Sequence, residues 1–382
     1  MKNFTVKTIN NTDIEKELEE IGFDNTYKKI AKDKFNYLNI KIYDLTIPQA
    51  NILKQTALSN GTDCAVNRNV LTNSTEKTDC ILTGSVSQLK KIAKSLKKQQ
   101  FGLKDLSENI EKLIETENKT TGTKLAGILN ITDNSFSDGG KYLEKDKAIE
   151  HLKELISEGA DIIDIGAEST KPYSEPVDTE TQLERITPVL EYIKENNITV
   201  PISIDTRDSK VAEECIKMGA DIINDVSGFD YDANMINVIK NSDVKIILQH
   251  SKGTPETMQN NPEYRNVIDD IYKELEKKTE LATENGIDKS RIIIDVGICF
   301  GKTREDNFKL LKRIEDFKSL GCEIMVGISR KSFLKLDDNL EKDIYSTAFS
   351  ALLIEKKVDY LRVHNVKMHK KLLELMEKYG EE

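Results

Sequence analysis

The sequence predicts an α/β protein in which a closed (β/α)8 TIM barrel follows a smaller N-terminal α+β domain. From Leu125 onward, eight short runs rich in Ile and Val recur, and each is followed by a helix-like stretch with apolar residues at i, i+3 and i+4. Near-continuous apolar runs are typical of parallel strands that helices cover. Eight such units in about 260 residues match the count and size of a closed barrel. A doubly wound open sheet is the alternative architecture.

The eight expected barrel strands are, in chain order, 125–130, 161–166, 201–205, 221–225, 244–249, 291–295, 323–327 and 359–364. Two of them follow a Gly-Ala-Asp sequence, which begins at Gly159 and at Gly219. This pattern is typical of a glycine just past a helix end, followed by a tight turn into the next strand. We therefore expect both glycines to be structural.

The sequence changes character at the polar stretch 115–124, where we place a domain boundary. Residues 1–120 form the expected N-terminal accessory domain, of unassigned role, and residues 121–382 form the expected barrel. In the accessory domain, apolar patterns predict strands at 37–45 and 79–84 and helices at 48–61 and 86–100. The last helix carries a basic run, which we interpret as a solvated face: Lys90, Lys91, Lys94, Lys97 and Lys98.

Composition excludes several classes of protein. The 382 residues include 56 Lys and Arg against 66 Asp and Glu, a net charge of −10, so nothing favours binding to nucleic acid or to an anionic membrane. Every apolar run is shorter than the roughly 20 residues that cross a bilayer. The five cysteines are scattered and lack C-x-x-C spacing, which argues against a disulfide framework or a structural zinc site. We expect a soluble, cytoplasmic protein.

Polar residues follow the expected strands at the end of the barrel where active sites lie. A single polar residue there is typical of a turn cap, but eight polar strand ends that converge favour a site. These residues are Asn130, Glu168 to Lys171, Asp205, Asn224, Gln249 to Ser251, Asp295, Ser329 to Ser332, Arg362 and His364.

The polar residues fall into two chemical sets. Carboxylate and amide groups suit the edge of a flat heterocycle with N–H donors, and these are Asp205, Asn224 and Asp295. Cationic and donor groups suit a phosphorylated or otherwise anionic substrate, and these are Lys171, Lys331, Arg362 and His364. Lys331 can also be a structural ion pair. Asn130 is either a turn cap or a ligand of Mg²⁺, which prefers oxygen.

Two other chemistries are disfavoured. The segment 297-GICFGKT-303 is similar to a phosphate-binding loop, but three residues separate its glycines where that motif requires four. The four histidines, which are His151, His250, His364 and His369, form no Ser-His-Asp or Cys-His pattern. Covalent catalysis is therefore not indicated.

Ordered motifs over residues 122–370 strongly resemble those of the dihydropteroate synthase family. They are 127-GILNITDNSFSDGG-140, 166-GAEST-170, 205-DT-206, 224-NDVSG-228, 253-GTPETMQNNP-262, 295-DVGICFGKT-303, 327-GISRKSFL-334 and 362-RVHNV-366. The resemblance implies a transferase of folate biosynthesis that condenses 7,8-dihydropterin-6-ylmethyl diphosphate with 4-aminobenzoate, giving 7,8-dihydropteroate and diphosphate. It also implies a homodimer with small-molecule substrates and no nucleic-acid or membrane partner.

The same resemblance assigns site residues. The pterin would be held by Asp205, Asn224, Asp295 and Lys331. The diphosphate would contact Thr170, Lys171, Arg362 and His364, with Mg²⁺ bound by Asn130. The aminobenzoate would lie against Phe300, Lys331 and Ser332, beneath loop 131–140. The family mechanism is dissociative, with Asp295, Lys331 and Arg362 as the catalytic residues and no strong base.

The chain departs from the family at several of these positions. Asp133 and Asn134 stand where proline and aspartate are usual, and Lys171 replaces an arginine with a point charge. Val296 and Cys299 replace a proline and a glycine. Three alternative functions stay open: a pterin-binding methyltransferase that uses a methyl-tetrahydropterin, the same condensation with a different para-substituted aniline, and a binding protein without catalysis.

Overall fold

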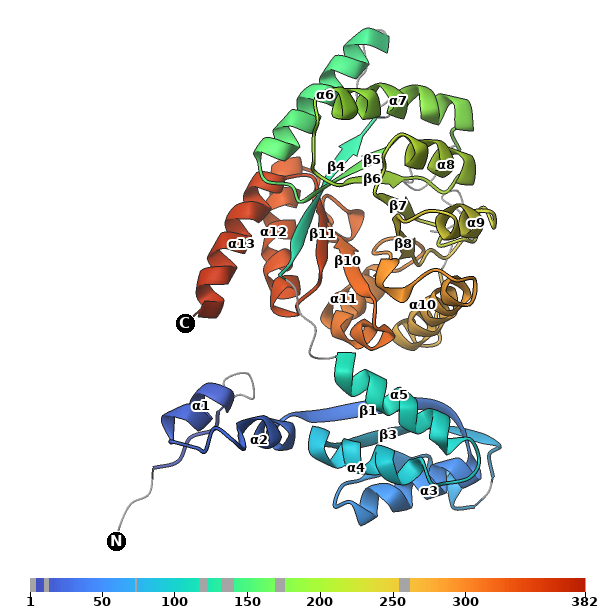
Figure 1. Ribbon diagram of the computed structural model, residues 1–382, viewed down its shortest axis with the longest axis vertical. Helices are drawn as coiled ribbons and strands as arrows, with labels where there is room; N and C mark the ends of the chain where they lie inside the picture. The colour runs from blue at the N-terminus through green and yellow to red at the C-terminus, as the bar shows by residue number, and fades with distance from the viewer. Residues whose placement is uncertain are drawn as a thin grey trace. The chain divides into compact units, whose positions relative to one another are not determined.

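The chain forms two compact units, Met1–Lys119 and Thr120–Glu382, and each is described by itself. The computed structural model, drawn in Figure 1, describes residues 5–9, 14–72, 74–116, 122–131, 141–168, 176–253 and 262–381. Among the helices of these ranges, none combines the length and the apolar character that a bilayer span requires.

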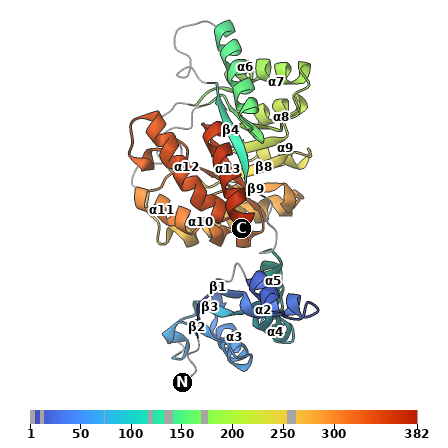
Figure 2. The ribbon, with the colours of Figure 1, turned by 90° about the vertical axis from the view of Figure 1, so that its left-hand side faces the viewer.

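The second unit is a closed barrel of eight parallel strands in the order β10-β11-β4-β5-β6-β7-β8-β9 (Figures 1 and 2). The predicted barrel is confirmed, each of the eight predicted runs contains a strand, and the open-sheet alternative is wrong. The strands are β4 Lys124–Asn130, β5 Ile162–Gly166, β6 Ile202–Asp205, β7 Ile222–Asp225, β8 Lys245–Gln249, β9 Ile292–Asp295, β10 Glu323–Gly327 and β11 Tyr360–Val363.

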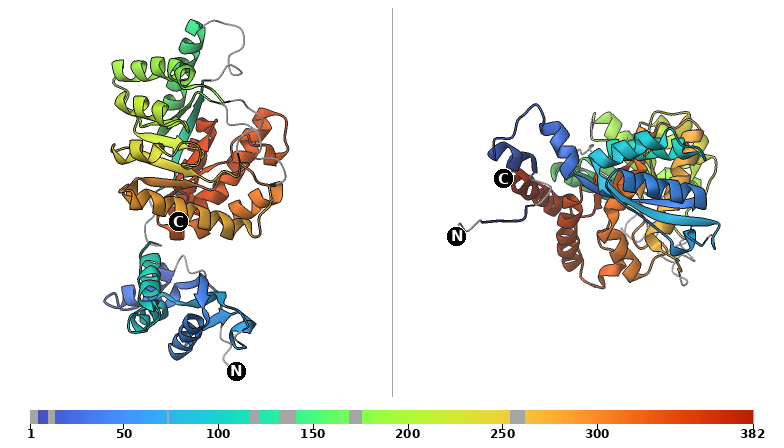
Figure 3. Two further views of the ribbon diagram at one scale, coloured as in Figure 1. Left: turned by 90° about the vertical axis from the view of Figure 1, so that its right-hand side faces the viewer. Right: turned by 90° about the horizontal axis from the view of Figure 1, so that it is seen from below.

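Helices surround this barrel on its outside, as the labelled view in Figure 2 and the side view in Figure 3 show. Local caps define where several of them begin; the Asp208 side chain, for example, accepts from the backbone of Lys210 and Val211 at the start of α8. The helices are α6 Lys141–Ser157, α7 Thr179–Glu195, α8 Ser209–Lys217, α9 Met235–Lys240, α10 Val267–Glu284, α11 Arg304–Lys312, α12 Asn339–Glu355 and α13 Val366–Glu381, with 3-10 turns at Lys289–Arg291, Ile314–Leu320 and Ser332–Leu334.

Two apolar layers hold the barrel together. Between strands and helices lies a large core of Ile, Leu and Val. Inside the barrel lies one smaller layer, made of Ala126, Ile162, Ile222, Ile247, Ile293, Met325 and Tyr360. Gly159 and Gly219 have φ of +92° and +108°, which confirms the prediction that these glycines end helices.

The first unit contains a three-stranded antiparallel sheet in the order β1-β3-β2, with α3 and α4 packed against β3 (Figures 1 and 3). Its elements are α1 Ile14–Glu20, α2 Lys28–Phe35, β1 Tyr37–Thr46, α3 Ile47–Ser59, β2 Cys64–Val66, a 3-10 turn at Arg68–Val70, β3 Lys77–Ser85, α4 Val86–Leu96 and α5 Leu103–Thr116. The two predicted strands and two predicted helices are confirmed, but the last helix ends at Leu96. The sequence patterns missed β2, α1 and α2, which are too short for a clear period.

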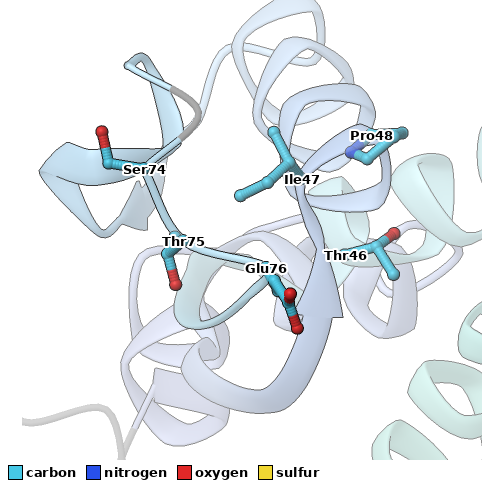
Figure 4. A pocket seen from close by; sticks show the side chains of 6 residues that line it. All are labelled: Thr46, Ile47, Pro48, Ser74, Thr75 and Glu76. Carbon is cyan, nitrogen blue, oxygen red and sulfur yellow. The ribbon is translucent and has the colours of Figure 1, made fainter.

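Neither the basic run nor a surface hollow of the first unit groups reactive side chains. Lys90 and Lys97 make exposed ion pairs with Asp33 and Glu111, at 2.6 and 2.7 Å, as expected of a solvated helix face. A surface hollow, drawn in Figure 4, has a single ionisable side chain and lies in the other unit from the barrel strand ends; its lining residues are Thr46, Ile47, Pro48, Ser74, Thr75 and Glu76.

Candidate active site

The carboxyl ends of neighbouring barrel strands bring the predicted acceptor residues to one end of the barrel. Asp205 on β6 is in register with Asn224 on β7, and Asp295 on β9 is in register with Gln249 on β8. Asp205, Asn224 and Asp295 are 6%, 3% and 4% exposed. Because buried carboxylates require partners, their neighbours define what this end of the barrel can bind.

Arg362 on β11 joins two of the buried carboxylates. Its Nε donates to Asp164 Oδ2 at 2.5 Å, and its Nη2 donates to Asp205 Oδ2 at 2.7 Å. Asp164 also accepts from Ser203 Oγ at 2.5 Å and from Asn224 Nδ2 at 3.3 Å. The sequence analysis missed Asp164, although a single carboxylate inside an apolar parallel strand was a signal for a buried ionic partner.

Burial and neighbouring charges shift the pKa values of this cluster. Burial raises the pKa of Asp205 to about 7; Arg362 opposes the shift, and the negative charge of Asp164 adds to it. Burial opposes protonation of Arg362, but Asp164 and Asp205 together raise the pKa of its guanidinium above its usual value. One guanidinium therefore faces two carboxylates, and the positive charge of Lys331 also lowers the pKa of Asp205.

Asp295 lies beside the predicted aminobenzoate residues. Its Oδ1 accepts from the Gly297 backbone at 2.7 Å, and burial raises its pKa although the positive charge of Lys331 opposes the shift. Lys331 Nζ donates to Ile298 O at 2.7 Å and lies 4.6 Å from the centre of the Phe300 ring. Burial lowers the pKa of Lys331. Among the described residues, the direct partners of Lys331 are thus a carbonyl oxygen and a ring face, and none of these residues forms a salt bridge with it.

The loop after β9 passes very close to the end of β8. At Gly297, φ is +67°, and an added Cβ would lie 1.9 Å from His250 O, so only glycine fits. Two residues later, Cys299 has φ of +70°, a conformation that costs a non-glycine residue of the order of 1 kcal/mol or more. A glycine at this position would adopt the same φ without that cost.

Lys302, His250 and Glu274 form a chain of contacts behind this loop, in which Lys302 and His250 are buried and Glu274 is exposed. The sequence analysis gave Lys302 and Glu274 no role. Lys302, 3% exposed, has its Nζ 2.9 Å from His250 Nδ1. On the other side of the imidazole, Nε2 lies 2.8 Å from Glu274 Oε2 on α10. Burial lowers the pKa of Lys302 to about 7. Lys302 was passed over because it lies in the segment that narrowly fails to match a phosphate-binding loop.

Because His250 is buried, we expect the free energy of unfolding to fall in acid. Burial and the adjacent Lys302 charge lower the pKa of His250 from 6.5 to about 4. The unfolded chain therefore takes up this proton near pH 6.5, but the folded chain only near pH 4, so the contribution to the free energy of unfolding is full above pH 6.5 and falls toward pH 4. Relative to His250→Gln, the wild type should lose up to roughly 3 kcal/mol over this range. Urea unfolding at stepped pH measures this, and parallel curves for the two proteins would contradict it.

The remaining predicted site residues are His364, Ser332, Thr170 and Lys171. His364 Nδ1 lies 3.0 Å from Ser329 Oγ, and Ser332 is exposed with its Oγ 3.9 Å from Cys299 Sγ. Thr170 and Lys171 lie outside the described residues. So do the departures at Asp133 and Asn134 and the rest of the loop 132–140, together with most of the stretch after β8.

Asn130 offers an oxygen that is suited to a hard cation. Its Oδ1 would be 3.3 Å from a Cβ built on Gly166, and Asp205 Cγ would be 3.8 Å from the same point, so the missing side chain of Gly166 leaves room beside both. No cluster of three or more Asp, Glu, His or Cys side chains is arranged for a metal within the described ranges. A cation here would therefore take few ligands from the protein, as Mg²⁺ does when phosphate and water supply the others.

Comparison with known proteins places this geometry in a family. The family described as pterin binding enzyme matches residues 126–364. The dihydropteroate synthase of Clostridium beijerinckii is 41% identical over 248 residues, which are 64% of this chain and 89% of that protein.

The chain belongs to the dihydropteroate synthases, within the pterin-binding enzymes.

A solved structure carries the same fold. The dihydropteroate synthase of Clostridium difficile, crystallised in the presence of pteroic acid, superposes with a TM-score of 0.64 at 34% identity, covering 69% of this chain and 98% of that one.

The likeness to one longer relative extends beyond the barrel. A probable bifunctional folylpolyglutamate synthase/dihydropteroate synthase of Haloferax volcanii is 33% identical over 346 residues, covering 83% of this chain. This share exceeds what Thr120–Glu382 alone could supply, so part of the first unit is included. The chain spans only 40% of that relative's length.

Proposed function

We propose that the chain condenses 7,8-dihydropterin-6-ylmethyl diphosphate with 4-aminobenzoate, giving 7,8-dihydropteroate and diphosphate for folate biosynthesis. The observation that carries the proposal is the buried Asp295 at the end of β9, in contact with the loop that holds Phe300 and near the ammonium of Lys331, in a chain of this family. A carboxylate of this kind can accept N–H donors from the edge of a pterin.

The residues around the two substrates have separate tasks in this proposal. Asp295 and Asn224 bind the pterin edge, with Asp205 and Lys331 beside them, and the ring of Phe300 with Lys331 and Ser332 receives the aminobenzoate. The C–O bond to the diphosphate breaks, the amine nitrogen bonds to the pterin methylene carbon, and one proton leaves the amine. Because the buried carboxylates lie in fixed positions, they stabilise positive charge on the pterin without reorganisation.

We propose that the diphosphate side of the site requires Mg²⁺. Arg362 is already bound to Asp164 and Asp205, and the buried Arg207 is paired with Glu168 at 2.8 Å. A diphosphate that enters the site therefore brings negative charge that these guanidinium groups do not balance. When bound, Mg²⁺ would neutralise phosphate oxygens, and Asn130 is the residue that would hold it. Thr170, Lys171, Arg362 and His364 are the proposed diphosphate contacts.

Replacement of Asn130 by alanine tests the metal assignment. We expect Asn130→Ala to raise the Mg²⁺ concentration for half-maximal rate by about tenfold or more, because loss of a ligand or of its support typically costs this much in metal affinity. Initial rates across a Mg²⁺ titration measure the shift. A titration identical to that of the wild type would show that Asn130 only caps the turn after β4.

Arylamine-dependent release of diphosphate tests the proposed reaction. Purified protein is mixed with the dihydropterin diphosphate and Mg²⁺, and diphosphate is assayed with and without 4-aminobenzoate. Release that depends on the amine supports the synthase. Release only with another para-substituted aniline would keep the synthase but overturn the folate assignment. If no aniline causes release of diphosphate, the proposed synthase activity is wrong, and the methyltransferase alternative is left.

We also propose that two copies of the chain associate and that the protein is cytoplasmic. Helices α12 and α13 pack against each other and carry several large exposed apolar side chains, which favour association. These are Leu340, Ile344, Tyr345, Leu352, Leu375 and Tyr379. All five cysteines are free thiols, as suits a reducing compartment. Analytical ultracentrifugation and cell fractionation test the two statements.

A further inference from the structure

The loop between β9 and α11 is held at two successive points by two lysines, of which Lys302 is buried and Lys331 is half-buried. Lys331 Nζ donates to Ile298 O at 2.7 Å, and Lys302 Nζ donates to Phe300 O at 2.9 Å. The backbone is therefore fixed both before Phe300 and at Phe300 itself. As a result the Phe300 ring lies against Lys331, with 4.6 Å between the ammonium and the ring centre.

Lys302 is not explained by solvation or by ion pairing. It is 3% exposed, and within the described ranges it makes no salt bridge. Its contacts are with neutral acceptors: besides Phe300 O they are His250 O at 3.3 Å and His250 Nδ1 at 2.9 Å. Burying an amine without a carboxylate in contact is costly, and an apolar side chain of similar length would fill the space without that cost. We therefore expect the role of Lys302 to lie in the groups that its Nζ binds.

His250 and Glu274 fix the position of the lysine. Burial and the nearby Lys302 charge lower the pKa of His250, so its ring stays neutral and Nδ1 can accept from the ammonium. The opposite nitrogen, Nε2, then carries the hydrogen; it lies 2.8 Å from Glu274 Oε2, a close contact that lacks the geometry of a hydrogen bond. Glu274 belongs to α10, and His250 follows β8. The position of the Lys302 ammonium is therefore set by residues of two elements outside the loop.

We propose that Lys302 is a positioning residue for the arylamine: it binds the carbonyl of Phe300 and the backbone of His250, and so holds the Phe300 ring against Lys331. This inference rests on the proposed function, because that function assigns the Phe300 and Lys331 pair to the aminobenzoate. Lys302 itself touches neither substrate. Its effect should therefore be seen in how the second substrate binds, more than in the chemical step.

The test is the replacement Lys302→Met, which keeps length and removes the donor. We expect the KM for 4-aminobenzoate to rise about tenfold, whereas the KM for the pterin diphosphate and kcat change less than about threefold. In Lys302→Gln an amide can still donate to Phe300 O, so the KM for 4-aminobenzoate should rise less, by about threefold. The glutamine variant also serves if the methionine variant does not fold.

A second lysine provides a matched control. Lys278 on α10 donates to Ser227 O and to Asp230 Oδ2, each at 2.7 Å, and so holds the loop after β7, with a carboxylate as one of its two partners. Lys278→Met should leave the KM for 4-aminobenzoate unchanged. If the wild type makes product but the Lys302 variants leave that KM unchanged, or change both KM values and kcat equally, the proposal is overturned. If the wild type releases no diphosphate, it is the proposed function that fails.

Discussion

Replacing Arg362 with methionine is expected to lower the free energy of unfolding by about 3–5 kcal/mol, because it leaves two buried carboxylates without a counter-ion. Asp164 is fully buried and Asp205 nearly so, and both accept hydrogen bonds from this one guanidinium. Activity should fall with stability, since Asp205 belongs to the proposed pterin pocket. Urea unfolding of wild type and variant at pH 7 measures the loss.

The double replacement Arg362→Met with Asp164→Asn separates charge from packing. Removing one of the two carboxylates should restore at least half of the lost stability, because only Asp205 is then left without a counter-ion, and burial already favours its protonated form. The matched surface control is Arg313→Met, which breaks an exposed pair with Asp316 and should cost less than about 1 kcal/mol. If Arg362→Met costs no more than this control, the buried cluster does not stabilise the barrel.

Replacing Asp295 with asparagine should lower turnover at least about tenfold while the fold is kept. Asparagine is nearly isosteric, but it presents an NH₂ group where the pterin edge has N–H donors. Two lost charge-assisted hydrogen bonds are worth roughly 1.5–3 kcal/mol each, which is ample for this effect. Steady-state kinetics, with thermal unfolding as a check on folding, give the result.

Asp225 is the control for this prediction. It lies at the end of β7, is fully buried, and accepts from Ser227 Oγ at 2.6 Å and from the Phe229 backbone at 2.7 Å, within its own turn. Asp225→Asn should lower stability more than turnover. Wild-type kinetics in Asp295→Asn, or an equal loss of turnover in both variants, would contradict a specific role of Asp295 at the pterin.

The sequence predicted the barrel well because the strands are short apolar runs, and several of these runs end in a polar residue. The run 291–295 illustrates this: Ile292, Ile293 and Ile294 are fully buried, and Asp295 follows at the end of the strand. The same rule located Asp205 and Asn224. In such barrels the strand end is both where the apolar pattern stops and where the site lies, so one signal gives both.

The partners of these residues could not be predicted in the same way. Asp164 lies inside an apolar run, and its link to Arg362 joins positions 198 residues apart, so it exists only once the barrel closes. Lys302 and His250 meet because the loop after β9 passes against the end of β8 at Gly297, a backbone approach that no local pattern encodes. Short-range periodicity predicts which residues reach the end of the barrel, but not which of them meet.

Analysis of the product formed by the purified 382-residue chain tests the central claim most directly. Dihydropterin methyl diphosphate, 4-aminobenzoate and Mg²⁺ are incubated with the protein, and the mixture is separated and identified by mass spectrometry. Our account predicts 7,8-dihydropteroate and diphosphate in equal amounts, with formation strongly reduced by Asp295→Asn. Absence of dihydropteroate at saturating substrates, with protein that remains folded, would contradict it.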